Sequence, residues 1–299
     1  MNLRKLLNNS TLELKKAGSK TASLDARILL EYSINQSNSY IISHSQEPIT
    51  NSNYQKFRRF IRRRLKGEPV AYITGSKEFY GYKFKVNKNV LIPRPETELI
   101  VENALHFLEF RIKNTEYSLN RNIKVIDIGT GSGCIIISLL KNYQKFIFDN
   151  SPFIIQACAT DNSRKALSIA KQNAKILEVY DQIKFYHSDL LQNNKIPRDL
   201  DIIIANLPYI PRKAVNIDKT SLSFEPNSAL YGGEKGYEDI IRLLEQIKEL
   251  SIKPNLILIE IFEDYALELK EMSSIIFPEY KSEIIKDLAG LNRILKIFK

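Results

Sequence analysis

The chain has 299 residues, of which 43% are hydrophobic and 26% are charged. This length accommodates one large domain or two of ordinary size, and the apolar content suffices for a packed core. No apolar run reaches the roughly 18 residues that a membrane helix needs, and the N-terminal sequence MNLRKLLNNS lacks the apolar core of a signal peptide. We therefore expect a cytoplasmic protein without a membrane span.

The net charge of +10 belongs to the first third of the chain. Residues 1–95 hold 18 Lys and Arg against 6 Asp and Glu, whereas the remainder holds 26 against 28. A basic N-terminal third favours an anionic partner such as RNA, a ribosomal complex or an acidic protein. A merely solubilising surface explains the asymmetry equally well, so both interpretations stay open.

Cysteine and histidine are scarce. Cys134 and Cys158 lie in apolar stretches, and we expect them to be buried free thiols of a reducing compartment. The three histidines, His44, His106 and His187, are scattered. Too few cysteines and histidines are therefore available for a zinc site or a histidine-based catalytic site, and the sequence predicts a metal-free protein.

Residues 1–74 are expected to be helical. Leucines at helical spacing predict a first helix that ends near Gly18, and Ser23 suits the N-cap of a second. A third helix over 54–66 has a basic face that either is simply solvated or docks a partner. Its predicted inward residues are Phe57, Ile61 and Leu65, and its predicted outward residues are Arg58, Arg59, Arg62, Arg63 and Lys66.

A hairpin and then an α/β region follow. We expect one strand over 79–86, a turn at 87–89 and a return strand over 90–92, after which Pro95 begins a helix. A polar loop is expected at 114–122. Further strands are predicted at 125–128, 153–159, 183–186, 202–205 and 256–261, with a final antiparallel pair at 283–285 and 294–298.

Helices are predicted between these strands, and this alternation indicates an α/β fold: a doubly wound, mostly parallel seven-stranded sheet. Ligands of such sheets bind outside the carboxyl ends of the strands. Four successive predicted strands end in Gly129–Gly133, Asp161, Asp189 and Asn206. Because these ends share one edge of the sheet, we expect them to form one pocket.

The spacing of the glycine-rich turn discriminates between cofactors. A dinucleotide site needs G-x-G-x-x-G, but this chain has D-x-G-x-G-x-G from Asp127, with a carboxylate awkward beside pyrophosphate. S-adenosylmethionine has no phosphate, and its ammonium group, ribose hydroxyls and adenine amino group suit Asp127, Asp161 and Asp189 respectively. Helix capping or backbone anchoring explains each carboxylate alone. The expected cofactor-binding residues are Asp127, Gly129, Thr130, Gly131, Ser132, Gly133, Asp161, Asp189, Leu190 and Asn206.

The loop after the predicted strand at 202–205 is Asn206-Leu207-Pro208-Tyr209. The side-chain oxygen of Asn206 and the carbonyl of Leu207 could accept both hydrogens of an amide or amine, with Tyr209 stacked on its plane. The loop would then aim the nitrogen at a methyl group. An ordinary Asn-x-Pro turn is the alternative. The expected catalytic and substrate-binding residues are Asn206, Leu207, Pro208 and Tyr209.

At these residues the chain resembles the HemK/PrmC family, the S-adenosylmethionine-dependent methyltransferases that act on release factors. The resemblance covers nearly the whole chain, and its connector motifs are more specific than its glycine-rich turn. The segments that carry it are LDARILL (24–30), RRLKGEPVAYITGSKEFYGYKFKV (63–86), VLIPRPETE (90–98), DIGTGSGC (127–134), ATDNS (159–163), SDL (188–190), NLPYI (206–210), EPNSALYGG (225–233) and DLAG (287–290).

The resemblance implies a class I methyltransferase fold at 95–299, a small helical substrate-docking domain at 1–74 and a β-hairpin linker at 75–94. It implies methyl transfer from S-adenosylmethionine, which leaves S-adenosylhomocysteine. The implied acceptor is the side-chain nitrogen of the glutamine in the Gly-Gly-Gln motif of class 1 peptide-chain release factors, a protein methylation that supports translation termination. The sequence does not decide which release factor is preferred. We expect a monomer, and nucleic-acid contact is compatible but not required.

Two positions depart from the pattern of the family. Leu207 stands where the family usually has proline, and Phe262 where it usually has glycine. We expect an active but less rigid loop, stabilised by up to ~1 kcal/mol in Leu207→Pro. The alternatives are an N6-adenine methyltransferase that acts on nucleic acid and a binding protein that keeps the cofactor pocket without turnover. The glycine spacing disfavours a nicotinamide dehydrogenase.

Overall fold

The computed structural model describes residues 1–114, 122–146, 154–213 and 222–299. The chain divides into two compact units. Unit 1 holds Met1–Ser76 and the described residues of 218–224, and unit 2 holds the remaining residues from Lys77 onward. The predicted hairpin linker groups mainly with unit 2, and the three-part division of the chain stays a prediction.

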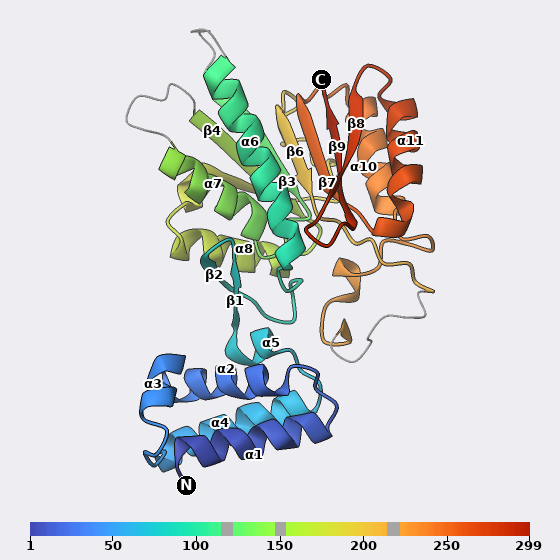
Figure 1. The fold of residues 1–299 in the computed structure, drawn as a ribbon. Coiled ribbons are helices and arrows are strands. Elements are labelled where there is room, and N and C mark those ends of the chain that lie inside the picture. The colour runs from blue at the N-terminus through green and yellow to red at the C-terminus, as the bar shows by residue number, and fades with distance from the viewer. Residues whose placement is uncertain (115–121, 147–153, 214–221) are drawn as a thin grey trace. The chain divides into compact units, whose positions relative to one another are not determined.

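Unit 1 is helical (Figure 1). Its core is apolar, and Leu6, Leu29, Phe57 and Ile61 are almost wholly buried there. Each helix therefore turns one stripe of large side chains inward. The helices are α1 (Leu3–Lys16), α2 (Ala22–Ile34), α3 (Asn38–Ser43), α4 (Asn51–Leu65) and α5 (Val70–Thr74).

Two details of unit 1 differ from the prediction. Ser23 lies inside α2 rather than at its N-cap, which is Thr21, and the Thr21 hydroxyl donates instead to Asp25. Leu65 is 38% exposed at the end of α4, while Phe60 is 7% exposed and takes its place in the core. The stripe of α4 is thus shifted toward 57, 60 and 61.

The basic face of α4 is partly neutralised within unit 1. Arg58 pairs with Glu13, Arg63 with Glu68 and Arg64 with Asp25. These bonds assign three of the five arginines of α4 to internal ion pairs rather than to a partner. Of the residues predicted to face outward, Arg59, Arg62 and Lys66 are exposed.

The hairpin differs from its predicted register. Strands β1 (Ser76–Phe79) and β2 (Tyr82–Lys85) flank a two-residue turn at Tyr80 and Gly81, whose φ angles are 51° and 75°. Two positive φ values are what a tight hairpin turn requires. The predicted turn at 87–89 is confirmed, with the amide of Val90 donating to the carbonyl of Asn87 at 3.1 Å. It does not join two strands, and the predicted return strand at 90–92 is wrong, because the hairpin already closes at Tyr80 and Gly81.

Unit 2 is built on a seven-stranded sheet with the order β5-β4-β3-β6-β7-β9-β8. Five strands are parallel, and β9 runs antiparallel to both β7 and β8. This confirms the predicted doubly wound, mostly parallel sheet. The strands are β3 (Asn122–Ile128), β4 (Ile154–Asp161), β5 (Ile183–His187), β6 (Ile202–Ala205), β7 (Leu256–Glu260), β8 (Lys281–Lys286) and β9 (Asn292–Phe298).

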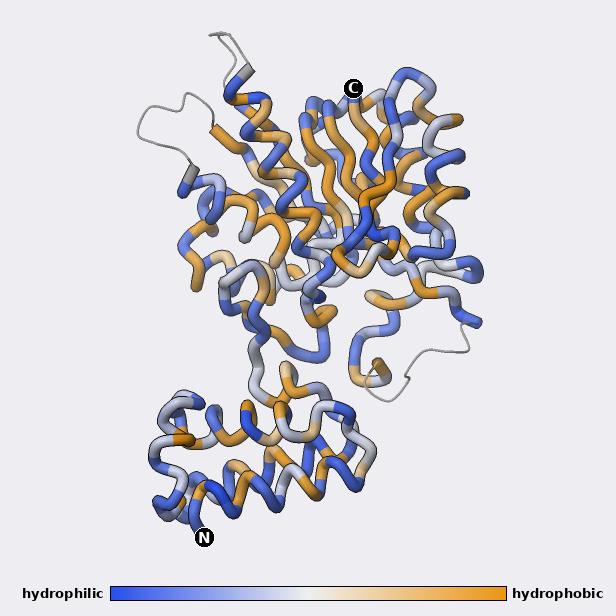
Figure 2. The backbone as a smooth tube through the Cα atoms, viewed as in Figure 1, coloured by the Kyte–Doolittle hydropathy of each residue, from blue (hydrophilic) through white to orange (hydrophobic). Residues whose placement is uncertain are grey.

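Helices cover both faces of this sheet (Figure 1). Alternate strand residues face opposite ways: Val125 and Ile202 pack in the same cluster as α6 and α7, whereas Ile126 and Ile203 pack with α10 and α11. The central strands β6 and β7 are accordingly buried along their length, and all of their residues except Glu260 are apolar (Figure 2). The helices are α6 (Glu98–Asn114), α7 (Cys134–Phe146), α8 (Arg164–Ile176), α10 (Glu238–Glu249) and α11 (Ala266–Ile276), with short 3₁₀ turns at Pro95–Thr97, Tyr180–Gln182, Asn227–Ala229 and Glu263–Tyr265.

The remaining predictions on this unit concern its cysteines, one loop and the start of one strand. Cys134 and Cys158 are buried free thiols, as predicted. Most of the loop expected at 114–122 and the first residue of the strand expected at 153–159 lie outside the described residues. Within the described ranges, no helix is both long and apolar enough to cross a membrane.

Candidate active site

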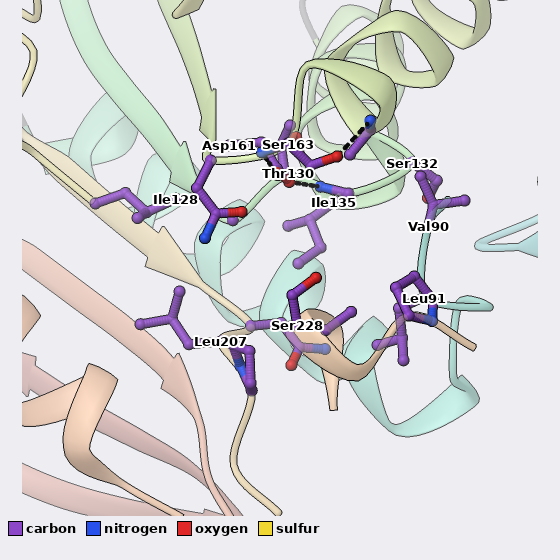
Figure 3. A pocket seen from close by; sticks show the side chains of 18 of the residues that line it. Val90, Leu91, Ile128, Thr130, Ser132, Ile135, Asp161, Ser163, Leu207 and Ser228 are labelled. Carbon is purple, nitrogen blue, oxygen red and sulfur yellow. Dashed lines mark hydrogen bonds between the residues drawn. The ribbon is translucent and has the colours of Figure 1, made fainter. Parts of the chain in front are cut away.

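A cavity of about 280 Å³ opens at the carboxyl edge of the parallel strands (Figure 3). Gly129, Asp161, Asp189 and Asn206, which follow or end β3, β4, β5 and β6, all line it. The structure therefore brings the four strand ends together in one place. The predicted site residues among its lining are Gly129, Thr130, Gly131, Ser132, Asp161, Asp189, Leu190, Asn206, Leu207 and Pro208.

The glycine-rich turn is held against its neighbours. Gly129 and Gly131 have φ angles of 73° and 54°, a region that L side chains rarely adopt. A Cβ on Gly129 would lie 3.0 Å from Cδ2 of Leu207, and the amide of Gly131 donates to Oδ2 of Asp161 at 2.9 Å. Glycine thus lets the turn pass close to the loop after β6.

Asp127 and Gly133 do not line the cavity. Asp127 is wholly buried beneath the turn, where its Oδ2 accepts from the Thr130 hydroxyl at 2.7 Å. Burial raises the pKa of Asp127 to about 7, against the lowering effect of the Thr130 bond. A Cβ on Gly133 would lie 2.8 Å from Cδ1 of Ile137 and 3.2 Å from Cβ of Ala170, so this glycine serves the packing of α7 and α8. The structure therefore places both residues away from the predicted cofactor contact.

Asp161 anchors backbone at the end of β4. Its Oδ2 accepts from the amide of Gly131 and its Oδ1 from the amide of Ser163, at 2.9 and 2.8 Å. Burial raises its pKa, while these two bonds lower it. Each carboxylate oxygen has a second lone pair, so the side chain can still accept from ligand hydroxyl groups. Ser163 is the N-cap of α8, and its side-chain oxygen accepts from the amide of Ala166.

The end of β5 contributes Asp189 and Leu190. Arg242 of α10 donates to Oδ2 of Asp189 at 2.6 Å and also pairs with Asp239. Leu190 is buried with a φ of 48°, which is rare for a branched side chain. Arg242 was not predicted, because nothing in the sequence indicates that α10 reaches this strand end.

The loop after β6 presents two acceptors. The side-chain nitrogen of Asn206 donates to Oγ1 of Thr97 at 3.1 Å and to Oε2 of Glu260 at 3.0 Å. Within the described part of the chain, neither Oδ1 of Asn206 nor the carbonyl of Leu207 has a hydrogen-bond partner. Both residues line the cavity. Two carbonyl-type oxygens are therefore available to bind one NH₂ group.

Glu260, at the end of β7, is a site residue to which the sequence assigned no role. It is 2% exposed, and its Oε1 accepts from the Tyr209 hydroxyl at 3.0 Å. Burial raises its pKa, against the lowering effect of hydrogen bonds from Thr97 and Tyr209. Its only signal in the sequence was a carboxylate that ends an otherwise apolar strand.

Tyr209 does not line the cavity. Its ring stacks on Phe262, with centroids 6.4 Å apart and planes 26° apart, and burial raises its pKa. Phe262 does not line the cavity either. Phe262 therefore packs against the Tyr209 ring and does not narrow the pocket.

The segment at 225–236 fixes the loop from the other side. Glu225 is 5% exposed and accepts from the amide of Ile92 and the guanidinium of Arg94, at 3.0 and 2.5 Å. A Cβ on Gly232 would lie 2.1 Å from the carbonyl oxygen of Pro208. Backbone of this segment thus touches backbone of the loop. Among the described residues, no group of three His, Cys, Asp or Glu side chains is placed to hold a metal.

Comparison with known proteins agrees with this geometry. Residues 5–75 match the family model of the PrmC N-terminal domain, and residues 112–224 match that of the methyltransferase small domain. The catalytic domain of hMettl16, solved with a MAT2A 3′UTR hairpin, has a TM-score of 0.54 at 17% identity, with 77% of this chain and 80% of that chain covered. At this identity the likeness shows the fold alone.

Similarity to curated relatives extends over the full chain. The chain is 33% identical to the release factor glutamine methyltransferase of Koribacter versatilis, with 99% of this chain and 98% of the relative covered. The corresponding enzyme of Coxiella burnetii is 34% identical over 93% of this chain and 92% of its own length. The bifunctional methyltransferase of Rickettsia conorii is 33% identical, but the chain spans only 57% of its length. The chain therefore belongs to the release factor glutamine methyltransferase family.

Proposed function

We propose that this protein transfers a methyl group from S-adenosylmethionine to the side-chain amide nitrogen of the glutamine in the Gly-Gly-Gln motif of class 1 release factors. The observation that carries the proposal is the pair of unpartnered acceptors at the cavity, Oδ1 of Asn206 and the carbonyl of Leu207. They suit a planar NH₂ group. The names of the two relatives matched over nearly their whole length supply the class of substrate.

The donor set of the cavity suits S-adenosylmethionine. Asp161 and Asp189 offer carboxylate oxygens to ribose hydroxyls and to the adenine amino group, and Leu190 offers an apolar surface to the ring. We assign Asp127 to anchoring the glycine-rich turn rather than to the ammonium group, because its side chain is wholly buried below that turn. When bound, this cofactor supplies a methyl carbon that leaves its sulfur without the bonding electron pair, so that S-adenosylhomocysteine remains.

The chain's own residues must compensate for a poor nucleophile, because the lone pair of an amide nitrogen is delocalised into its carbonyl. Asn206 and Leu207 would each accept one N–H of the glutamine and so fix the direction of its nitrogen. Such positioning contributes up to ~7–11 kcal/mol to lowering a barrier. The same oxygens stabilise the positive charge that develops on nitrogen as its bond to the methyl carbon forms. The nitrogen then releases one of its two protons to water, which restores a neutral amide. His187 does not line the cavity and its ring bonds to the carbonyl of Asn162, so we assign it no role as a base.

Unit 1 is the proposed docking surface for the release factor. Its exposed basic residues on α4 fit an acidic region of a protein partner. Contact with nucleic acid is not required by the reaction. We expect a cytoplasmic enzyme, where its substrate is made and used.

The test uses labelled S-adenosylmethionine with release factor and, separately, with adenine-containing nucleic acid. We expect label on the release factor alone, and Asn206→Ala should lower transfer by at least about 100-fold while cofactor affinity stays nearly unchanged. Label on adenine, or no transfer to either substrate, would overturn the proposal. Full turnover by Asn206→Ala would refute the role of its side chain.

A further inference from the structure

Three elements converge behind Asn206. Thr97 lies in the 3₁₀ turn before α6, Asn206 follows β6 and Glu260 ends the neighbouring strand β7. Thr97 and Glu260 are each 2% exposed, so the contacts between them are shielded from water. Hydrogen bonds in such surroundings are costly to leave unmade.

Both hydrogens of the Asn206 amide nitrogen are used here. One is donated to Oε2 of Glu260 at 3.0 Å and the other to Oγ1 of Thr97 at 3.1 Å. The Tyr209 hydroxyl donates to Oε1 of Glu260 at 3.0 Å, and the Thr97 hydroxyl also bonds to this carboxylate. These three hydrogen-bond partners of Glu260 thus all act as donors, which suits a carboxylate that accepts with both oxygens.

This arrangement decides which end of the amide faces the cavity. The two ends of an asparagine amide have nearly the same shape, but one accepts hydrogen bonds and the other donates. An acceptor-only carboxylate binds the NH₂ end of Asn206 and repels the oxygen end, so Oδ1 turns toward the cavity. The reversed amide would present two donors to the NH₂ group of the substrate, which has no useful lone pair to offer them.

The geometry points to Glu260 as a positioning residue for methyl transfer, one that acts through Asn206 by holding its amide with Oδ1 toward the methyl acceptor. This inference rests on the proposed function for the identity of the acceptor. Glu260 does not line the cavity and touches neither substrate nor cofactor by this account. Its effect on turnover passes through the orientation of one side chain.

The test compares Glu260→Ala with Glu260→Gln. Alanine removes both acceptor oxygens, and we expect kcat to fall by about 10²–10³-fold, the loss typical when a group aimed at transition-state charge is removed. Glutamine keeps one carbonyl oxygen for Asn206 and turns its NH₂ to the Tyr209 oxygen, so kcat should stay within about tenfold of the wild type. The Kd for S-adenosylmethionine should be unchanged in both. Thr97→Val, which removes one acceptor and keeps the carboxylate, serves if Glu260→Ala does not fold, and should lower kcat by about tenfold.

Asp201→Asn is the matched control. Asp201 precedes β6 at the end opposite Asn206, and its carboxylate also accepts two hydrogen bonds, from the amide of Lys124 and the side chain of Asn255. It should lower stability and leave kcat unchanged. A purely structural role for Glu260 would make the two positions behave alike.

A second measurement does not depend on turnover. In ¹⁵N-labelled protein, the side-chain NH₂ signals of Asn206 should exchange slowly in the wild type and in Glu260→Gln, and rapidly in Glu260→Ala. Glu260→Ala with wild-type kcat, Glu260→Gln as inactive as Glu260→Ala, or an exchange rate that does not change would each overturn the inference. A wild type that methylates no release factor would instead refute the proposed function, while the exchange measurement would still report on the amide.

Discussion

At the scale of single residues, Leu207 is the position where the structure most changes the expectation from the sequence. The residue is 4% exposed, and its side chain belongs to the apolar cluster under α10. Proline restricts the unfolded chain, which stabilises by up to ~1 kcal/mol, but it also loses about one buried carbon, which costs about 0.8 kcal/mol.

The free energy of unfolding of Leu207→Pro should therefore lie within about 1 kcal/mol of the wild-type value. It should also keep its turnover, because the carbonyl at 207 remains. Leu207→Ala, the control for the side chain, should cost about 2–5 kcal/mol. Urea titration of both variants checks this account, and a Leu207→Pro protein that gains well over 1 kcal/mol would show that loop rigidity dominates over packing.

Asp127 makes stability depend on pH. Its pKa rises from 3.8 to about 7 on folding, so between these values the folded protein holds a proton that the unfolded chain has released. The contribution of Asp127 is thus fully present below pH 3.8 and is lost as the pH rises toward 7. Because an asparagine at position 127 does not titrate, Asp127→Asn should lack this contribution to the pH dependence of the free energy of unfolding.

The measurement is the free energy of unfolding of both proteins across this pH range. The difference between wild type and Asp127→Asn should fall steadily as the pH rises. Glu260 and Asp161, whose pKa values burial also raises, titrate in both proteins and cancel in the comparison. Parallel curves for the two proteins would contradict the buried, protonated carboxyl.

At the scale of elements, the segment at 225–236 is the support on which the loop after β6 lies. A Cβ on Gly232 would sit 2.1 Å from the Pro208 carbonyl oxygen and 2.3 Å from that of Gly236, and neither backbone group can swing away. Gly232→Ala should cost about 1–3 kcal/mol by overpacking. It should also lower kcat more than it weakens cofactor binding, because it displaces the acceptor carbonyl of Leu207.

Gly290→Ala is the comparison variant. Gly290 has a φ of 83° and nothing within 4 Å of the added Cβ, so the cost there comes from backbone conformation alone. It lies in the turn between β8 and β9. Wild-type kcat in Gly232→Ala, measured beside this variant, would show that the segment does not hold the loop.

Elements that carry a strong local pattern could be predicted from the sequence. Strand β6 and the inward residues Phe57 and Ile61 of α4 were placed correctly, because apolar runs and apolar periodicity are local patterns. The turn at Tyr80 and the left-handed Leu190 were not, since tertiary contacts hold these residues in a conformation that they do not favour. Strand ends predicted the cavity, but contacts between distant strands, such as Asn206 with Glu260, leave no local pattern.

At the scale of the whole molecule, charge is divided between the two units. The basic surplus of the first 95 residues includes the exposed residues Arg59 and Arg62 of α4 and Lys66, which follows this helix. If unit 1 docks the release factor as proposed, reversing these three charges to glutamate should raise KM about tenfold at low ionic strength, with kcat unchanged. The difference should shrink as salt screens the charges.

A matched variant reverses the same number of charges on unit 2, at Lys270, Lys281 and Lys286, which are also exposed. It should leave KM near that of the wild type. Equal changes in KM for the two triple variants would mean that net charge, and not the face of α4, governs the encounter.

In the proposed function, two oxygens of the loop after β6 present a glutamine amide nitrogen for methylation. The most direct measurement is fragmentation mass spectrometry, combined with ¹⁵N NMR, of a class 1 release factor incubated with this protein and S-adenosylmethionine. We expect one added methyl group, on the side-chain nitrogen of the Gly-Gly-Gln glutamine, and none when Asn206→Ala replaces the wild type. A methyl group on any other atom, or an unmodified glutamine after incubation with active wild type, would contradict it.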